Sequence, residues 1–343
     1  MKAAVLYKIG DLRIEERPRP VPAADEVLVR IKAVGVCGSD LHFYHEGRIG
    51  EKVVERPYVL GHEASGEIVE VGPAVVGFKP GDRVCLEPGI PCRKCAYCKR
   101  GDYNLCPNGV YQSGPHTDGF FQEYTAIPAD YVFRLPEQMD WIEGALIEPF
   151  AVGLHATWRG NVQPGQTVAI MGSGPIGLVT LLAAICHGAT TTIVSDVIDK
   201  RLEMAKEFGA THVINAAQAD TVAEVQRLTG GLGADVVVET AGAIPTTQQS
   251  VFAARKGGTV VLVGMTSQNV LPFDTLRLLR AELNVKGCFR YANQFPKAVA
   301  LAAAGRVNLK PLASHTFPLA EIKEAFEFSL KRKDIAMKVV ITI

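Results

Sequence analysis

Hydrophobic and polar residues follow different patterns in the two halves of the chain. In about the first 150 residues, short β-branched runs are separated by segments rich in Pro and Gly, which is typical of short strands joined by turns. The clearest runs cover residues 26–34, 66–71, 83–86 and 131–135. This half of the chain is therefore predicted to be a compact β-rich domain.

From about residue 167, apolar runs alternate with helical patterns. The runs are VAIM, TIVS, HVIN, DVVVE, TVVLVG and NVKGCF. Between them lie segments such as 199–209, in which Leu202, Ala205 and Phe208 share one helix face and Gly209 stands at the expected C-terminal cap. Strands that are nearly all apolar and alternate with helices predict a parallel sheet covered on both faces.

The alternation fades after about residue 290. A helix is expected where Ile322, Ala325, Phe326 and Ser329 recur at i, i+3, i+4 and i+7, and the final run MKVVITI reads as a strand. That strand is expected to return to the first domain.

Composition narrows the class of protein. A chain of 343 residues with 48% hydrophobic residues suggests about two domains with their own cores. The 36 basic and 36 acidic residues cancel, so neither nucleic acid nor an anionic membrane is an expected partner. The first 20 residues lack the apolar core of a secretory signal, and a reducing, cytoplasmic location is expected.

The motif GSGPIG follows one predicted strand and opens a helix. Gly172 makes the tight turn, Gly174 lets a pyrophosphate approach the backbone, and Gly177 lets helix pack on strand. Asp196, at the end of the next strand, can accept hydrogen bonds from a ribose diol and would repel a 2′-phosphate. NAD is therefore favoured over NADP, although Arg201 is close enough in sequence to pair with such a phosphate.

Four of the eight cysteines are closely spaced, as Cys92, Cys95, Cys98 and Cys106. Thiolates with this spacing can converge on Zn²⁺, and in a reducing compartment two local disulfides are the weaker alternative. Because all four thiolates would bind the metal, this zinc is expected to be structural. Cations that would offset the negative charge of the cluster are interleaved with the cysteines, as Arg93, Lys94, Lys99 and Arg100.

A second group of metal-ligand types is dispersed along the chain. It comprises Cys37 in CGSDLH, His62 and Glu63 in GHEASGEIVEVG, and Glu148 in LIEPFAVGLHA. A cysteine, a histidine and a carboxylate can hold a catalytic zinc with one position open for substrate. By spacing alone, a buried free cysteine and a hydrogen-bonded histidine remain the commoner explanation.

Taken together, these motifs resemble the zinc-dependent medium-chain alcohol dehydrogenases over essentially the whole chain. Within that family, four segments resemble the polyol branch, which is typified by sorbitol (L-iditol) and xylitol dehydrogenases. These segments are GRIGEKVVERPYVLGHEASGEIVEVG, KPGDRVCLEPG, GALIEPFAVGLHA and GCFRYAN. The resemblance implies an α/β protein with a GroES-like β-rich catalytic domain, residues 1–152 and 291–343, and a Rossmann domain with a doubly wound parallel sheet, residues 153–290.

The same resemblance implies a set of site residues. The catalytic zinc would bind Cys37, His62 and Glu63, with Glu148 beside the zinc water or ligating in an alternative state. Ser39 and His42 match the family's proton relay, and Glu148 is the competing base. The residues implied to contact the nucleotide are Gly172, Gly174, Pro175, Ile176, Gly177, Asp196, Arg201, Val263, Gly264, Met265, Phe289 and Arg290.

Substrate contacts are implied for Phe43, Glu148, Arg290 and Tyr291, the last two as hydrogen-bonding partners for hydroxyls beyond the reacting carbon. Phe43 stands where the animal sorbitol dehydrogenases carry a tyrosine that touches substrate, so one hydroxyl contact is missing. Those animal enzymes also lack the complete four-cysteine lobe, which places this chain closer to bacterial and other two-zinc members.

The resulting hypothesis is an NAD- and zinc-dependent enzyme that interconverts a sugar alcohol and its 2-ketose, as a homotetramer by family analogy. Two alternatives stay open: a 2,3-butanediol or threonine dehydrogenase, and an NAD-binding protein without chemistry. Cys85, Cys186 and Cys288 carry no assigned chemistry. The sequence leaves open which polyol is oxidised, its stereochemistry, the third zinc ligand, the relay route and the strictness of NAD use.

Overall fold

Strand pairing and packing divide the chain into two units. The computed structural model describes residues 1–115 and 117–343. Unit 1 comprises Met1–Glu148 and Phe295–Ile343, and unit 2 comprises Pro149–Gln294. The division falls inside helix α4 (Ile147–Gly160), a continuous element, so no turn or polar segment marks it in the sequence.

Unit 1 is built mainly from short strands. Its strands are β1 (Lys2–Lys8), β2 (Asp11–Glu16), β3 (Glu26–Gly35), β4 (Arg48–Ile49), β5 (Lys52–Val53), β6 (Tyr58–Val59), β7 (Glu63–Val71), β8 (Arg83–Leu86), β9 (Gly89–Ile90), β10 (Val110–Tyr111), β11 (Tyr124–Pro128), β12 (Val132–Arg134), β19 (Ala313–Pro318) and β20 (Lys338–Thr342). Its helices are α1 (Gly38–Glu46), α2 (Ala96–Lys99), α3 (Trp141–Ala145), α10 (Phe295–Ala303) and α11 (Ile322–Lys331), with 3₁₀ turns η1 (Tyr103–Leu105), η2 (Ala129–Tyr131), η3 (Lys310–Leu312) and η4 (Leu319–Glu321).

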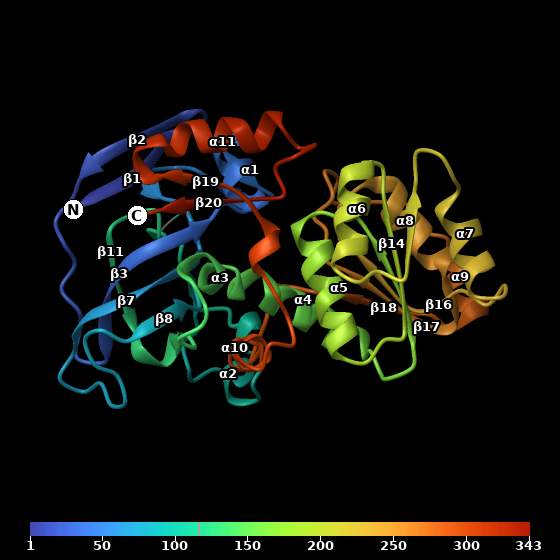
Figure 1. Ribbon diagram of the computed structural model, residues 1–343, viewed down its shortest axis with the longest axis horizontal. Coiled ribbons are helices and arrows are strands. Elements are labelled where there is room, and N and C mark those ends of the chain that lie inside the picture. Colours follow the sequence, from blue (N-terminus) through green and yellow to red (C-terminus); the bar gives the residue numbers. More distant parts are fainter. Residues whose placement is uncertain (116) are drawn as a thin grey trace. The chain divides into compact units, whose positions relative to one another are not determined.

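The main sheet of unit 1 joins the two ends of the chain. Its order is β12-β8-β7-β3-β20-β19, and β11 also pairs with β3. The predicted terminal strand forms as β20 and pairs antiparallel with β3, with Val340 opposite Gly35 (Figure 1). Gly35 is also opposite Glu63 on the other side of β3. This register brings residues 35, 63 and 340 side by side, and the metal-ligand types described below lie at this point.

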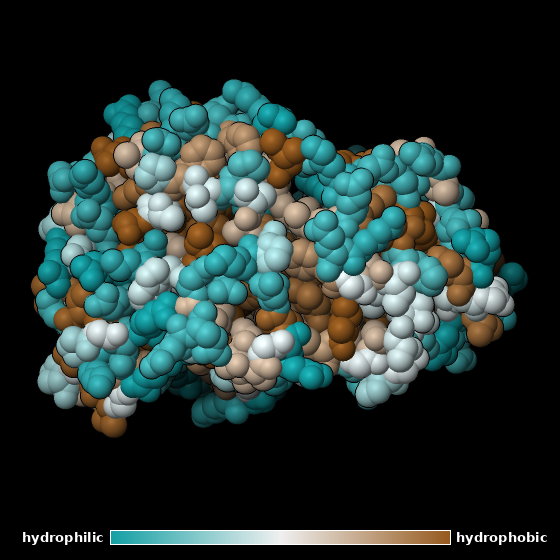
Figure 2. All heavy atoms as spheres, in the orientation of Figure 1, coloured by the Kyte–Doolittle hydropathy of each residue, from teal (hydrophilic) through white to brown (hydrophobic). Residues whose placement is uncertain are grey.

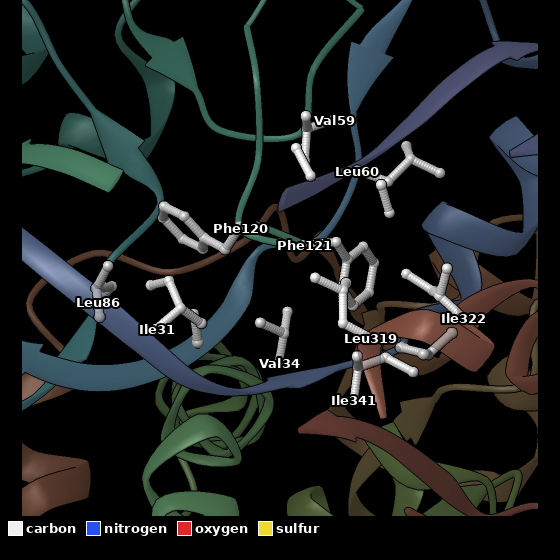
Figure 3. Close-up of a cluster of buried hydrophobic side chains, with 14 of the residues drawn as sticks. Ile31, Val34, Val59, Leu60, Leu86, Phe120, Phe121, Leu319, Ile322 and Ile341 are labelled. Carbon is white, nitrogen blue, oxygen red and sulfur yellow. The ribbon is translucent and has the colours of Figure 1, made fainter. Parts of the chain in front are cut away.

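The core of unit 1 gathers side chains from segments far apart in sequence. Ile31, Phe121 and Ile341 are fully buried, and Ile322 of α11 joins them (Figure 3). Ala325 and Phe326 are buried on the same face of α11, as their helical spacing predicts. Burying these apolar side chains fixes the curved sheet against α11.

Unit 2 has the strand-helix alternation that the sequence predicts. Its elements are β13 (Thr167–Met171), α5 (Pro175–Cys186), β14 (Thr191–Asp196), α6 (Asp199–Glu207), β15 (His212–Asn215), α7 (Thr221–Leu228), β16 (Ala234–Glu239), α8 (Ile244–Ala253), β17 (Ala254–Leu262), α9 (Thr275–Ala281) and β18 (Asn284–Gly287). The strands form one parallel sheet in the order β15-β14-β13-β16-β17-β18. Helices α5 and α6 cover one face of this sheet, and α7, α8 and α9 cover the other (Figure 1).

Local sequence explains how α6 ends. Leu202 and Ala205 are buried on its inner face, and Phe208 at its C-cap is buried beside them. Gly209 follows with φ +95°, a left-handed conformation that favours glycine. The predicted helix and its cap are confirmed.

Figure 2 shows one face of the molecule, on which hydrophilic and hydrophobic residues are mixed. In the part of the chain that the structure describes, no helix is both long and apolar enough to span a bilayer. The uncharged stretch between Arg159 and Asp196 is instead a buried strand, a turn and helix α5.

Candidate metal centres and cofactor site

The four-cysteine lobe is the loop of a small hairpin. Strands β9 and β10 pair antiparallel, and the segment between them carries Cys92, Cys95, Cys98 and Cys106. The four sulfur atoms lie within 4.8 Å of one another, with 3.4 Å between those of Cys95 and Cys98. Four thiolates at these distances fit tetrahedral zinc and leave no coordination position open.

Backbone N–H groups donate hydrogen bonds to two of these sulfur atoms. The N–H of Cys92 donates to Sγ of Cys106 at 3.3 Å, and the N–H of Cys98 donates to Sγ of Cys95 at 3.5 Å. Backbone hydrogen bonds lower the pKa of the Cys92 thiol to about 6 and also lower the pKa of Cys95. Burial and the neighbouring thiols raise the pKa of Cys98 to about 12, so the backbone donors favour thiolate, the form that binds zinc, at Cys92 and Cys95.

Two of the four cations expected to offset the charge of the lobe are paired with carboxylates. Arg93 lies 3.4 Å from Asp25 and 3.5 Å from Asp130, and Arg100 lies 2.5 Å from Asp102. These ion pairs reduce the charge that the arginines offer to the thiolates. Backbone donors thus contribute more to the lobe than the sequence indicates.

The dispersed ligand types also converge. Cys37 is the N-cap of α1, just after β3, while His62 and Glu63 stand where β7 begins. Their candidate ligand atoms lie within 4.8 Å of one another. His62 and Glu63 are buried, and Cys37 is half-buried. This donor set fits a zinc ion with a position left open.

Asp40 supports the histidine and the cysteine of this group. Its carboxylate accepts hydrogen bonds from the N–H groups of Cys37 and Gly61 and from the hydroxyl of Ser113. Oδ1 of Asp40 lies 3.5 Å from Nδ1 of His62, which leaves Nε2 for a metal. Burial raises the pKa of Asp40, but His62 and the backbone donors outweigh it and hold that pKa below its usual value. Asp40 is therefore an anion behind the imidazole.

Glu63 has a buried cationic partner. Nζ of Lys338, from β20, lies 2.7 Å and 2.8 Å from the two carboxylate oxygens, and it donates to the carbonyl oxygen of Val36 at 3.2 Å. Burial lowers the pKa of Lys338, but Glu63 and Cys37 outweigh burial and raise it. A Cβ atom at Gly35 would collide with the Glu63 carboxylate, so glycine there makes room for this ion pair.

Glu148 lies near Cys37, His62 and Glu63, but it is not one of the residues whose ligand atoms lie within 4.8 Å of one another. It is buried in the first turn of α4, and its Oε1 accepts a hydrogen bond from the hydroxyl of Tyr111 at 3.4 Å. The ring of Tyr111 is tilted against His62, with 5.6 Å between centroids. Of the two predicted carboxylate ligands, Glu63 is the one grouped with Cys37 and His62.

Helix α1 carries three further predicted residues. Ser39 is half-buried, two residues after Cys37, and His42 is exposed, with Nδ1 at 2.8 Å from Glu46. This order, inner hydroxyl and outer imidazole, is the one that a proton relay to solvent needs. Phe43 instead lies in the hydrophobic core, edge-on to Tyr58, where it packs as a core side chain.

In unit 2 the glycine motif forms the turn between β13 and α5. Gly172 has φ +105°, and a Cβ atom at Gly177 would collide with the carbonyl oxygen of Gly172. At Gly174 the nearest atom to such a Cβ would be Nη1 of Arg201, 3.9 Å away, so the space in front of this residue is open. Pro175 is the first residue of α5, followed by Ile176. The open space and the helix N-terminus fit a pyrophosphate.

Asp196 ends β14 beside this turn. One of its carboxylate oxygens accepts the N–H of Ser173 at 2.8 Å, and the other accepts those of Val197 and Ile198. Arg201 Nη1 lies 3.9 Å from Asp196 and is mostly buried. These bonds hold the carboxylate at the edge of the sheet, and its remaining lone pairs can accept ribose hydroxyls.

The other predicted contacts are at or after the ends of β17 and β18. Val263, Gly264 and Met265 follow β17, and the N–H groups of Val263 and Gly264 donate to the carbonyl oxygen of Glu239. After β18, Arg290 stacks on Phe289 with 4.7 Å to the ring centroid, while Tyr291 is buried. Together with Gly172 and Asp196, these residues mark the carboxyl edge of the parallel sheet, where such folds bind nucleotides.

Sequence reasoning missed Asp40, Tyr111 and Lys338. Two signals were present: Asp40 occupies the third helical position of α1, a capping position, and Lys338 is the one charged residue of its strand. Tyr111 carries no such signal, because its place beside His62 depends on the hairpin that closes the cysteine lobe.

Known families and proteins match both units. Residues 23–137 match the alcohol dehydrogenase GroES-like domain, and residues 175–304 match the zinc-binding dehydrogenase family. A sorbitol dehydrogenase from Bacillus subtilis is 45% identical over 341 residues, covering 99% of this chain and 97% of the relative.

Solved structures match over the same length. An oxidoreductase of unknown specificity from Escherichia coli is 40% identical with a TM-score of 0.96, covering 100% of this chain and 99% of its own. A 2R,3R-butanediol dehydrogenase from Bacillus subtilis is 31% identical with a TM-score of 0.91, at 100% and 99% coverage. Two further matches, from Sinorhizobium meliloti and Escherichia coli, hold NADP and NADH.

The chain belongs to the zinc-dependent medium-chain alcohol dehydrogenase family and is an oxidoreductase of that family. Within the family it groups with the sorbitol dehydrogenases, to which its sequence is similar over nearly the whole chain. The predicted GroES-like and Rossmann fold classes are confirmed.

Proposed function

We propose that this protein oxidises a sugar alcohol to the corresponding 2-ketose with NAD, reversibly. The observation that carries the proposal is the convergence of Cys37, His62 and Glu63 within 4.8 Å in a chain 45% identical to a sorbitol dehydrogenase. The reaction removes a proton from the hydroxyl oxygen and a hydride from the adjacent carbon, and the hydride reduces NAD to NADH. Zinc, when bound, acts as a Lewis acid at the alcohol oxygen.

The side chains of this protein then have distinct tasks. Cys37, His62 and Glu63 hold the metal, and Asp40 orients the imidazole through Nδ1. Ser39 and His42 carry the hydroxyl proton towards solvent, and Glu148 is the alternative base. Because Phe43 packs in the core and has no hydroxyl, recognition of the remaining substrate hydroxyls falls to other donors, Arg290 and Tyr291 among them.

For the nucleotide we propose NAD. Asp196 is held in place by three backbone N–H groups, and its negative charge would repel the 2′-phosphate of NADP. Arg201 is drawn towards that carboxylate, which reduces its availability to a phosphate. Replacing Asp196 by Ala should therefore weaken NAD and improve the relative use of NADP.

One panel assay tests the proposal. NADH formation is measured with sorbitol, xylitol, ribitol, galactitol, 2,3-butanediol and threonine, and each is repeated with NADP. A higher kcat/KM for one or more of the polyols is expected, with little activity on NADP. Preference for 2,3-butanediol or threonine would overturn the polyol assignment, and no turnover of any alcohol by the zinc-loaded protein would overturn the enzymatic one.

A further inference from the structure

The buried Lys338 is an unusual neighbour for a metal ligand. It is 3% exposed, and Glu63 is 1% exposed. Glu63 Oε1, Glu63 Oε2 and the Val36 carbonyl oxygen are three acceptors around a group with three N–H donors. Full use of those donors indicates an ammonium ion.

The position of this ion pair is set by the sheet. Glu63 and Val340 are the partners of Gly35 on either side of β3, so Lys338 and Glu63 extend from the two strands that flank it. Gly35 has no side chain to separate them. The lysine therefore holds both oxygens of the Glu63 carboxylate, on the same residue that is grouped with Cys37 and His62.

Lys338 changes the electrostatic charge of the metal site. A Zn²⁺ bound by the Cys37 thiolate and the Glu63 carboxylate is neutral, and the buried anion Asp40 stands behind His62. Lys338 adds one positive charge within hydrogen-bond distance of the carboxylate, in a buried site where screening is weak. A more positive site attracts zinc less strongly and favours loss of the proton from the substrate hydroxyl.

We infer that Lys338 is a positioning residue that holds Glu63 and makes the metal site one charge more positive than it would be without the lysine. It trades zinc affinity for easier deprotonation of the alcohol. The inference rests on the zinc site of the proposed function but not on the identity of the alcohol, and metal binding can be measured without any substrate.

The test compares Lys338→Met with the wild-type protein. Zinc affinity is measured against a graded zinc buffer, with Co²⁺ absorption separating the one-thiolate site from the four-thiolate site. We expect the variant to bind zinc at the one-thiolate site about tenfold or more tightly, and kcat with the best alcohol to fall by about tenfold or more. Zinc affinity would rise while kcat falls. Loss of a merely structural contact would not raise zinc affinity.

Two further variants complete the design. Lys338→Arg keeps the charge and should return zinc affinity to within about threefold of wild type. Lys331→Met removes an exposed Lys–carboxylate pair of 2.8 Å, to Glu327, and should change neither quantity. Weaker zinc binding in Lys338→Met, or unchanged zinc binding, would overturn the inference.

Should Lys338→Met not fold, Lys338→Gln takes its place, because the amide can still donate hydrogen bonds to the Glu63 carboxylate but carries no charge. It should bind zinc at the one-thiolate site about tenfold or more tightly than the wild type, with a lower kcat. Zinc binding equal to or weaker than that of the wild type in a folded Lys338→Gln would overturn the inference.

Discussion

Unit 1 contains two groups of metal-ligand side chains that are built in opposite ways. The cysteine lobe takes all four sulfur atoms from one loop between β9 and β10 and supports them with backbone N–H groups. The second group takes Cys37 from the start of α1 and two donors from β7, and supports them with buried side chains, Asp40 and Lys338.

The two kinds of support suit the two sites to different roles. Backbone donors and identical ligands give a closed site that ties a loop together. Buried charged supports cannot be left unpaired, so Asp40 and Lys338 hold Cys37, His62 and Glu63 in place only when the whole sheet is folded. Such a site can keep a coordination position open without collapsing around the metal.

Glu87 lies between the two groups. Its buried carboxylate accepts the hydroxyl of Tyr103 from the lobe at 2.7 Å, and burial, with Glu148 as a smaller contribution, raises its pKa to about 7. Tyr111, at the end of the lobe hairpin, reaches Glu148 and His62. The lobe therefore has direct contacts with the surroundings of the second group.

The largest effect is expected for Cys37→Ser. Removing the thiolate from the open site should lower kcat/KM by about a thousandfold or more, because the remaining donors hold zinc weakly. The protein should still contain about one zinc per chain, in the lobe, and melt near the wild-type temperature. Metal analysis and steady-state kinetics check this, with Cys186→Ser as the control. Two zinc ions per chain in the inactive variant would contradict the assignment.

Cys95→Ser should have the complementary effect. Loss of one lobe thiolate should lower the melting temperature by about 10 °C or more and make the loop between β9 and β10 sensitive to protease, because metal binding ties that loop. Cobalt bound at the one-thiolate site should keep its absorption spectrum. Unchanged thermal stability in calorimetry would show that the lobe does not stabilise unit 1 through a metal.

A smaller effect is expected for Asp40→Asn. The amide cannot accept all the hydrogen bonds that the carboxylate accepts from Cys37, Gly61 and Ser113, and it removes the anion behind His62. Zinc affinity at the open site should fall about 10- to 100-fold, with the lobe metal retained. Competition with a chromophoric chelator measures this. Asp102→Asn, which removes an exposed carboxylate from the lobe, serves as control and should leave open-site affinity unchanged.

The smallest effect is a pH dependence of stability. The pKa of Glu87 is raised from 4.5 to about 7, so between these values the folded protein keeps a proton that the unfolded chain releases. Its contribution to stability is fully present below pH ~4.5 and is lost as pH rises towards 7. Glu87→Gln should be more stable than wild type by about 3 kcal/mol at pH 8 and nearly equal to it at pH 4.5. Urea unfolding at both pH values checks this, with the exposed Glu70→Gln as control. A gain that is the same at both pH values would contradict the ionisation account.

Features that depend on neighbours in sequence were predictable. The strand-helix alternation of unit 2 and the cap of α6 at Gly209 follow from local periodicity and backbone preference. The four-cysteine group was predictable for the same reason, since its spacing limits how far apart the sulfur atoms can be. The GSGPIG turn also formed as predicted, with Gly172 in the left-handed region.

The supports of the open site were not predictable. Glu63 and Lys338 are 275 residues apart, and only the pairing of β7 and β20 with β3 brings them together. Phe43 shows the converse: a residue matched to a substrate position by resemblance packs in the core of this chain. The strand-helix alternation, the glycine turn and the cysteine lobe could be predicted from the sequence, because short-range spacing specifies them. Only the tertiary structure decided which charges surround Cys37, His62 and Glu63, because strand register, and not sequence distance, sets which buried groups must neutralise one another.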